Sequence, residues 1–352
     1  MKPLILLLFV VAAPTNWALS QGCVAIRNVA GISPDLLFKN IQPNDKLIFN
    51  VTNRYFEAST SFKATHIFSD TLVTNRINTL NISVIKLLSK GWSFALNVPI
   101  AANSRNNGAD HKGVLSYPKY TTHAFGLGDI RLTVYKWFLD PSIHTKWNIQ
   151  GGLGLKIPTG DFRYQDYFYR KDDSTVFAPV DQAIQLGDGG TGITAELSAF
   201  YSFTNSINIY FQGFYLINPR EQNGVSNLKG RAPTQSQIKN NTTVMSVPDQ
   251  YSLRGGASFQ FKKLVLTAGL RYEKVPENDL MGGTKGFRRA ATIASVEPGL
   301  TYKMKNTLAF VYTGIPYYRN IKQNTQNDMT PAGFAEVIWN FGVQFKLGST
   351  TK

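Results

Sequence analysis

Alternation of apolar and polar side chains along long segments is the feature that most constrains how this chain folds. In residues 191–204 and 207–219, odd-numbered positions are mostly apolar or aromatic, whereas even-numbered positions include Glu196, Asn208 and Gln212. A period of two is that of a β-strand, whose successive side chains point to opposite faces of a sheet. Both segments exceed the five or six residues typical of strands in soluble sheets. Strands of this length cross a bilayer when they are tilted.

The same alternation recurs along the chain and predicts about 12 strands. They are expected at residues 46–58, 75–88, 92–104, 126–139, 146–160, 191–204, 207–219, 249–261, 264–276, 290–304, 307–319 and 333–347. The connections between them alternate strictly between short and long. The long, polar ones fall at 59–74, 105–125, 161–190, 220–248, 277–289 and 320–332. Outer-membrane barrels have tight periplasmic turns and long external loops. The sequence therefore predicts an all-β fold, a transmembrane antiparallel up-and-down β-barrel; a soluble barrel or sandwich is the alternative.

The N-terminus predicts export. Residues 1–20 combine Lys2 with a short apolar run and end in small residues, as a cleaved signal peptide does. The single cysteine, Cys23, cannot form an internal disulfide, and whether it carries a lipid stays open. Residues 21–45 are not strand-like, and we expect them either in the periplasm or in the lumen as a plug. The barrel is expected over residues 46–352.

Parity along the predicted strands also indicates which charged side chains face the barrel interior. These lumen-lining candidates are Arg54, Asp129, Arg131, Lys156, Glu196, Arg254, Arg271, Glu273, Glu297, Lys303 and Glu336. Two interpretations of them remain open. The charges either pair with one another and rigidify a narrow lumen, or they line a pore that selects polar or anionic solutes. The chain's net charge of +15 fits anionic partners in general.

Aromatic residues mark two further features. The long segment 161–190 carries Tyr164, Tyr167, Tyr169 and Arg170, which could constrict the mouth, recognise a ligand or form part of an interfacial belt. Other aromatics near strand ends are expected at the membrane–water interfaces, where their rings suit both environments. They are Trp92, Trp137, Trp147, Tyr201, Tyr215 and Tyr272.

The sequence does not predict an enzyme. The four histidines, His66, His111, His123 and His144, fall in predicted loops or turns, and none lies beside an inward serine. We expect no metal site and no cofactor, because the ligand spacing of known sites is missing. Nucleic-acid binding is not expected, since the basic residues are spread over loops and turns.

Three segments resemble a known family. GLGDIRLTVYKWF (126–138), GGLGLKIPTGDF (151–162) and QLGDGGTGITAELSAFYSF (185–203) are similar to the outer-membrane family labelled MetA-pathway of phenol degradation. The similarity covers residues 126–203, and the rest of the chain agrees only in architecture. The resemblance implies a barrel and suggests transport of small organic compounds. It implies no catalytic residue.

Together these observations predict an outer-membrane, porin-like channel or transporter for small organic or anionic solutes in a Gram-negative bacterium. Its expected partners are outer-membrane lipid and small solutes, and homo-oligomerisation stays open. The alternative is a barrel that does not transport and serves as a surface anchor, a partner-binding protein or a component of envelope assembly.

Overall fold

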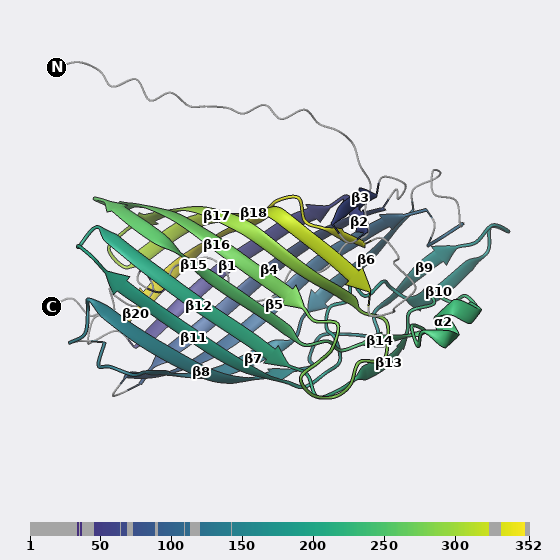
Figure 1. Ribbon diagram of the computed structural model, residues 1–352, viewed down its shortest axis with the longest axis horizontal. Coiled ribbons are helices and arrows are strands. Elements are labelled where there is room, and N and C mark those ends of the chain that lie inside the picture. The colour runs from purple at the N-terminus through teal and green to yellow at the C-terminus, as the bar shows by residue number, and fades with distance from the viewer. Residues whose placement is uncertain are drawn as a thin grey trace, which may run out of the picture.

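The structure is a computed structural model that describes residues 34, 36, 46–63, 65–68, 73–88, 91–108, 110–112, 120–141, 143–323 and 332–348. Its main feature is one antiparallel sheet closed into a 12-stranded barrel (Figure 1). The barrel strands are β1 (Leu47–Ala58), β4 (Val73–Leu87), β5 (Trp92–Asn107), β6 (Thr121–Leu127), β7 (Ile130–Trp137), β8 (Trp147–Ile157), β11 (Gly192–Ser202), β12 (Ile207–Ile217), β15 (Gln250–Phe261), β16 (Leu264–Val275), β17 (Arg289–Lys303), β18 (Thr307–Gln323) and β20 (Ile338–Leu347). Both β6 and β7 pair with β5 and together occupy one of the twelve positions.

The barrel closes because the first strand pairs on both sides. On β1, Val51 lies opposite Ile82 of β4 and opposite Val343 of β20. Every remaining neighbour pair is also antiparallel, and β4 pairs with β5 as well as with β1, so the strands form a closed ring. Closure lets the backbone groups of the wall bond to one another, as hydrocarbon requires. The predicted fold class is therefore confirmed.

Two strands differ from the prediction. The predicted strand 126–139 is longer and is broken into β6 and β7 at Gly128 and Asp129; both halves pair with β5. The predicted strand 333–347 begins only at Ile338. The residues before it form β19 (Ala332–Phe334), which pairs with β2 (Thr60–Lys63) in a small sheet outside the barrel.

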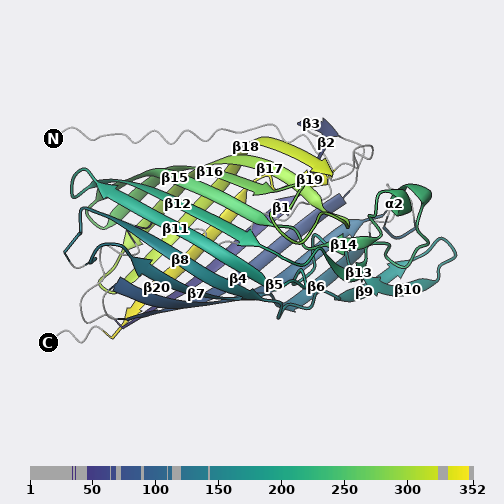
Figure 2. The same cartoon turned by 60° about the horizontal axis from the view of Figure 1, so that its bottom comes forward.

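The short and long connections lie at opposite ends of the barrel (Figures 1 and 2). The end with the long connections carries β2 and β19, β3 (His66–Phe68), β9 (Gln165–Tyr169), β10 (Thr175–Pro179), β13 (Gln222–Ser226), β14 (Val244–Ser246) and α2 (Gln235–Lys239). We call this end the mouth. Among the described helices, none is long and apolar enough to cross a membrane.

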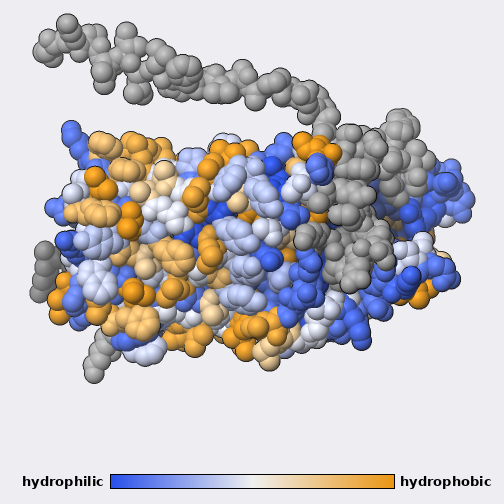
Figure 3. Space-filling model, in the orientation of Figure 1, coloured by the Kyte–Doolittle hydropathy of each residue, from blue (hydrophilic) through white to orange (hydrophobic). Residues whose placement is uncertain are grey.

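Side chains alternate between the two faces of the wall, as the period of two predicts. In β11, Thr194 and Phe200 are buried inside the barrel, while Ile193, Leu197 and Tyr201 are exposed outside. Apolar side chains cover much of the outer wall, and hydrophilic ones gather at the mouth (Figure 3). Trp137 is the exception to the expected aromatic belt: it is only 4% exposed and packs inside against Phe200 and Tyr210. In β7 the buried side chains of Arg131 and Thr133 are at odd-numbered positions, so Trp137 lies on the same inward face.

Of the predicted N-terminal segment 21–45, only Pro34 and Leu36 are described, and both are helical. Leu36 is buried in a cluster with the inward-facing residues Val265, Leu308, Phe310 and Tyr312. The predicted signal peptide and Cys23 lie outside the described residues.

Candidate functional site: the occluded mouth and the lumen

The connection between β8 and β11 folds into the mouth of the barrel. Its residues 180–187, here called the inward segment, are buried except for the half-buried Gln182. Val180, Ile184 and Leu186 pack in one apolar cluster with side chains from walls that lie on different sides of the barrel. The wall residues include Phe56 on β1, Ile77 on β4, Ala101 on β5, Ala124 on β6, Ile293 on β17, Ile321 on β18 and Ile338 on β20. The inward segment therefore fills the lumen at this level.

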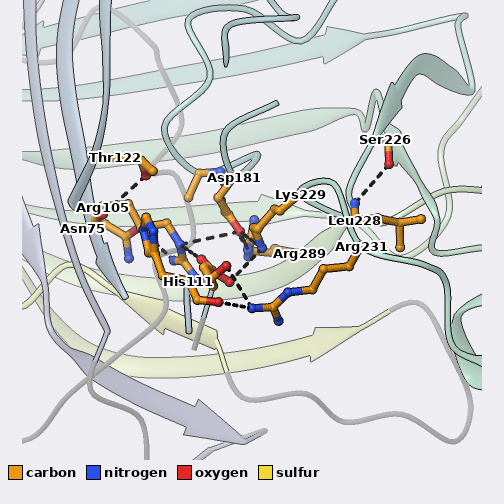
Figure 4. Close-up of polar contacts among 12 residues, drawn as sticks. Asn75, Arg105, His111, Thr122, Asp181, Ser226, Leu228, Lys229, Arg231 and Arg289 are labelled. Atoms are coloured by element: carbon orange, nitrogen blue, oxygen red, sulfur yellow. Dashed lines mark hydrogen bonds and ion pairs between the residues drawn. The ribbon is translucent and has the colours of Figure 1, made fainter. Parts of the chain in front are cut away.

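Asp181 anchors the inward segment by ion pairs to several elements (Figure 4). Its carboxylate lies 2.7 Å from Arg289 on β17, 3.0 Å from Lys229 and 3.7 Å from Arg105 on β5. Asp110 completes the group, 2.8 Å from Arg105 and 3.1 Å from Lys229. In the closed sheet, β5 and β17 are separated by several strands in either direction. We call these five residues the mouth network; it joins β5 and β17 to three of the long connections.

The cations of the mouth network keep both of its carboxylates ionised. Burial alone would raise the pKa of Asp181, but Arg105, Arg289 and Lys229 outweigh it and hold that pKa well below its usual range. Asp110 behaves in the same way: burial opposes ionisation, Lys229 and Arg105 favour it, and its pKa falls to about 2. Both carboxylates are therefore ionised at neutral pH, and the three cations exceed them by one charge.

The aromatic candidates of segment 161–190 occupy different places. Tyr164 packs against the apolar cluster of the inward segment, whereas Tyr167 is exposed on β9. Tyr169 stacks on Tyr120 with 4.6 Å between ring centroids. Arg170 donates to the carbonyls of Asp110 and Lys229. Thus Tyr164 and Arg170 contact the inward segment and the mouth network respectively, while Tyr167 and Tyr169 belong to the outer hairpin of β9 and β10.

A buried histidine joins this hairpin to the mouth network. His111 is 1% exposed, and its Nδ1 accepts a hydrogen bond from the Tyr169 amide at 3.1 Å. Burial lowers its pKa to about 4; Asp110 opposes this shift and Arg170 adds to it. The imidazole is therefore neutral at neutral pH, and protonation would turn its accepting nitrogen into a donor facing another donor.

Acidification is therefore expected to loosen this contact. In the folded loop His111 stays neutral down to about pH 4, whereas in the unfolded loop its pKa is the ordinary 6.5. Between these two pH values the unfolded form therefore binds more protons than the folded form. Stability of the contact is full above this window and falls as the pH drops through it, by up to about 3 kcal/mol. The protection factor of the Tyr169 amide, which is the intrinsic exchange rate divided by the observed rate at the same pH, should fall as the pH drops across the window. The variant His111→Gln should lose this dependence, and a wild-type protection factor that stays constant from pH 7 to 4 would contradict the assignment.

The three segments that resemble the outer-membrane family meet beside the inward segment. The carboxylate of Asp129 accepts hydrogen bonds from the backbone N–H groups of Gly160 and Asp188 at 3.0 and 3.2 Å. A Cβ on Gly160 would come within 2.9 Å of the Gly187 backbone, so only glycine allows this approach. The side chain of Lys156 contacts Asp188 and lies 3.8 Å from Asp129. These contacts among Asp129, Lys156, Gly160 and Asp188, here called the junction, fix where the inward segment meets the wall.

A cavity of about 130 Å³ lies in the lumen next to this junction, and we call it the lumen cavity. Charged residues of its lining are Asp129, Arg131, Lys156, Asp188 and Arg289. Apolar residues of its lining include Pro99, Phe214, Leu216, Met245 and Val275. The inward segment contributes Gln182, Ala183 and Gln185, and Arg289 of the mouth network also lines the cavity, so the cavity adjoins that network.

The remaining lumen candidates form paired wall contacts or lie elsewhere. Arg254, Arg271, Glu273 and Glu297 make one buried ion-pair ladder across β15, β16 and β17. Glu196 accepts a hydrogen bond from Tyr135, and Lys303 donates to Gln260. Arg54 is buried with its guanidinium 5.6 Å from the Phe56 ring. Glu336 does not face the lumen from a strand: it precedes β20, is exposed and accepts from Ser59 and Thr60, because the chain there follows the outer sheet of β19 and β2.

Sequence reasoning missed Asp110, Asp181, Lys229 and Arg289, which lie in predicted loops or at a predicted boundary. One signal was available. Segment 178–186 contains Ala178, Val180, Ala183, Ile184 and Leu186, and this is a high apolar content for an external loop in water. Among the described residues, no group of three or more His, Cys, Asp or Glu side chains could hold a metal ion.

Comparison with known proteins shows the fold. An outer-membrane channel from Pseudomonas putida F1 matches with a TM-score of 0.58 and 13% identity, over 87% of this chain and 96% of that one. The toluene transporter TbuX of Ralstonia pickettii matches with a TM-score of 0.41 and 11% identity, over 89% of this chain and 92% of that one. The NanC porin matches with a TM-score of 0.42 and 10% identity, over 85% of this chain and 100% of that one. The latter two are too distant to support an argument.

No protein-family model matches the chain, and no curated protein does. The resemblance of residues 126–203 to the phenol-degradation family accordingly stays a prediction. The chain has the fold of an outer-membrane channel barrel.

Proposed function

We propose that the protein is an outer-membrane channel for small organic or anionic solutes, narrowed at its mouth by the inward segment. One observation carries this proposal. Beside the inward segment, the barrel interior is not packed solid but holds a cavity lined by both apolar and charged side chains. Ligand sites generally combine an apolar lining with a few placed polar groups. A barrel serving only as an anchor needs no such space.

The same fold supports a location in the outer membrane. The apolar outer wall fits contact with outer-membrane lipid, and a signal peptide at residues 1–20 would direct export of the chain. The family resemblance favours organic solutes, and the small basic excess of the mouth network favours anions. The proposal includes no enzymatic activity, and the outer-membrane channel from Pseudomonas putida F1 supports it at the level of the fold.

Single-channel recording of the protein purified from outer membranes tests this proposal. In a planar bilayer under a salt gradient, we expect discrete conductance steps with a reversal potential that favours anions. The variant Arg131→Glu should shift that potential towards cations, because it replaces a cation of the cavity lining by an anion. Charge reversal at Arg271, by contrast, would break its ion pairs with Glu273 and Glu297. That variant would therefore test the stability of the barrel and not its ion preference.

The control is Lys136→Glu, which changes charge by the same amount on the same strand. Lys136 lies over the ring of Trp92, which is exposed on the outer wall, so ion preference should not change. Absence of conductance from a demonstrably folded barrel, with and without candidate solutes, would overturn the proposal and favour the non-transporting alternative.

A further inference from the structure

Arg131 differs from the other cations around the lumen cavity. Its side chain is inward-facing on β7 and only 9% exposed. Among the described residues, no carboxylate lies within 4.0 Å of it, and its Nη1 atom has no hydrogen-bond partner. A buried guanidinium without an anion is costly, because burial removes the water that would otherwise stabilise its charge.

The carboxylates around the cavity already contact other cations. Lys156, which lies opposite Arg131 in the pairing of β7 with β8, contacts Asp188 and Asp129. Arg289 is held by Asp181. None of these carboxylates lies within 4.0 Å of Arg131, so its guanidinium is left able to take an anion as a direct partner.

The guanidinium is also oriented. Its centre lies 5.4 Å from the centroid of the Phe214 ring, which is a cation–π contact that positions the group. The N–H groups of a guanidinium lie in its plane and match the two oxygens of a carboxylate. Phe214 and Leu216 provide an apolar surface on the same cavity lining.

The size of the cavity limits the solute. Its volume of about 130 Å³ is similar to that of roughly 150 Å³ cavities in protein interiors that accept benzene. One small ring therefore fits, whereas a sugar acid of several residues does not.

We propose that the lumen cavity binds a small monocarboxylate with a single ring or an apolar body of similar size. The carboxylate pairs with Arg131, and the body lies against Phe214 and Leu216. This inference rests on the proposed function, because only in a channel would such a site select which solute crosses the membrane. Binding itself can be measured without transport.

Titration calorimetry of the purified, detergent-solubilised barrel tests the site, with benzoate as the probe and benzamide as its uncharged analogue. We expect saturable binding of benzoate at one site and binding of benzamide that is weaker by roughly 10- to 100-fold, the usual range for a charged hydrogen bond. In Arg131→Met, benzoate affinity should fall to that of benzamide, while benzamide affinity stays unchanged. The control Lys136→Met, on the outer face of the same strand, should bind benzoate as the wild type does.

Two results would overturn the site: equal affinity of the wild type for benzoate and benzamide, or unchanged benzoate binding in a folded Arg131→Met barrel. Recording conductance from the same preparation separates this failure from failure of the proposed function. A barrel that conducts but does not bind benzoate refutes only the carboxylate site. A barrel that binds benzoate through Arg131 but never conducts refutes only the channel.

Discussion

Replacing Asp181 with asparagine is expected to release the inward segment and to shift the channel strongly towards a conducting state. Asp181 neutralises Arg289 and Lys229 at 2.7 and 3.0 Å, and its side chain is 1% exposed. An amide cannot balance these charges, and removing one partner of a buried ion pair typically costs about 3–5 kcal/mol. If this loss falls on the occluded state alone, the ratio of open to occluded channels rises more than about 100-fold. The measurement is the open fraction in single-channel recordings.

The matched control is Asp172→Asn in the same connection. Asp172 is exposed, and its carboxylate accepts from the Ser174 amide and hydroxyl at the tip of the β9–β10 hairpin. Its removal should leave the open fraction unchanged. Heat-dependent gel mobility reports whether each barrel is folded. A folded Asp181→Asn barrel with a wild-type open fraction would show that the inward segment stays in place without the mouth network.

The wall of the barrel was predictable because its signal is local. Alternation with a period of two specifies both the strand and the face of each side chain, and tight turns leave little freedom between neighbouring strands. For this reason the inward positions of Arg131, Lys156, Arg254 and Arg271 follow from parity alone. Parity does not place Glu336 correctly, because β19 leaves the wall to pair with β2. The alternation of the sequence does not distinguish that pairing from continuation of the wall strand.

The mouth could not be predicted in the same way. Arg289 and Asp181 are 108 positions apart and meet only because a long connection turns inward. The three glycine- and aspartate-containing segments are also distant in sequence, and their meeting depends on how Asp129 caps two backbone N–H groups. Such contacts form only once the barrel has closed. The apolar composition of residues 178–186 indicates that this part of the connection is buried, but not which residues it contacts.

The predicted lumen charges lie in two different settings. On β15, β16 and β17, Arg254, Arg271, Glu273 and Glu297 satisfy one another within the wall. On the β7 side, Arg131 faces a cavity with no carboxylate partner among the described residues. The first setting fits the interpretation in which paired charges rigidify the lumen, and the second fits our proposal that a solute pairs with Arg131.

The ladder in β15–β17 leads to the second large expected effect. Replacing Glu297 with glutamine should lower the free energy of unfolding by about 3–5 kcal/mol, because two buried arginines lose their shared anion. Glu297 lies 2.6 Å from Arg254 and 3.4 Å from Arg271. These arginines face each other directly across the pairing of β15 with β16, where like charges repel unless an anion lies between them. Urea unfolding in detergent, followed by gel mobility, measures the loss.

An exposed pair provides the comparison. Glu57 and Arg76 lie 2.9 Å apart on β1 and β4, but their side chains are 38% and 55% exposed. Glu57→Gln should therefore cost at most about 1 kcal/mol. The double variant Arg254→Met with Glu297→Gln should recover part of the lost stability, because Arg271 keeps Glu273 and the unpaired cation is gone. If Glu297→Gln is no more destabilising than Glu57→Gln, the ladder does not hold this wall together, and its charges would instead be solvated by water in the lumen.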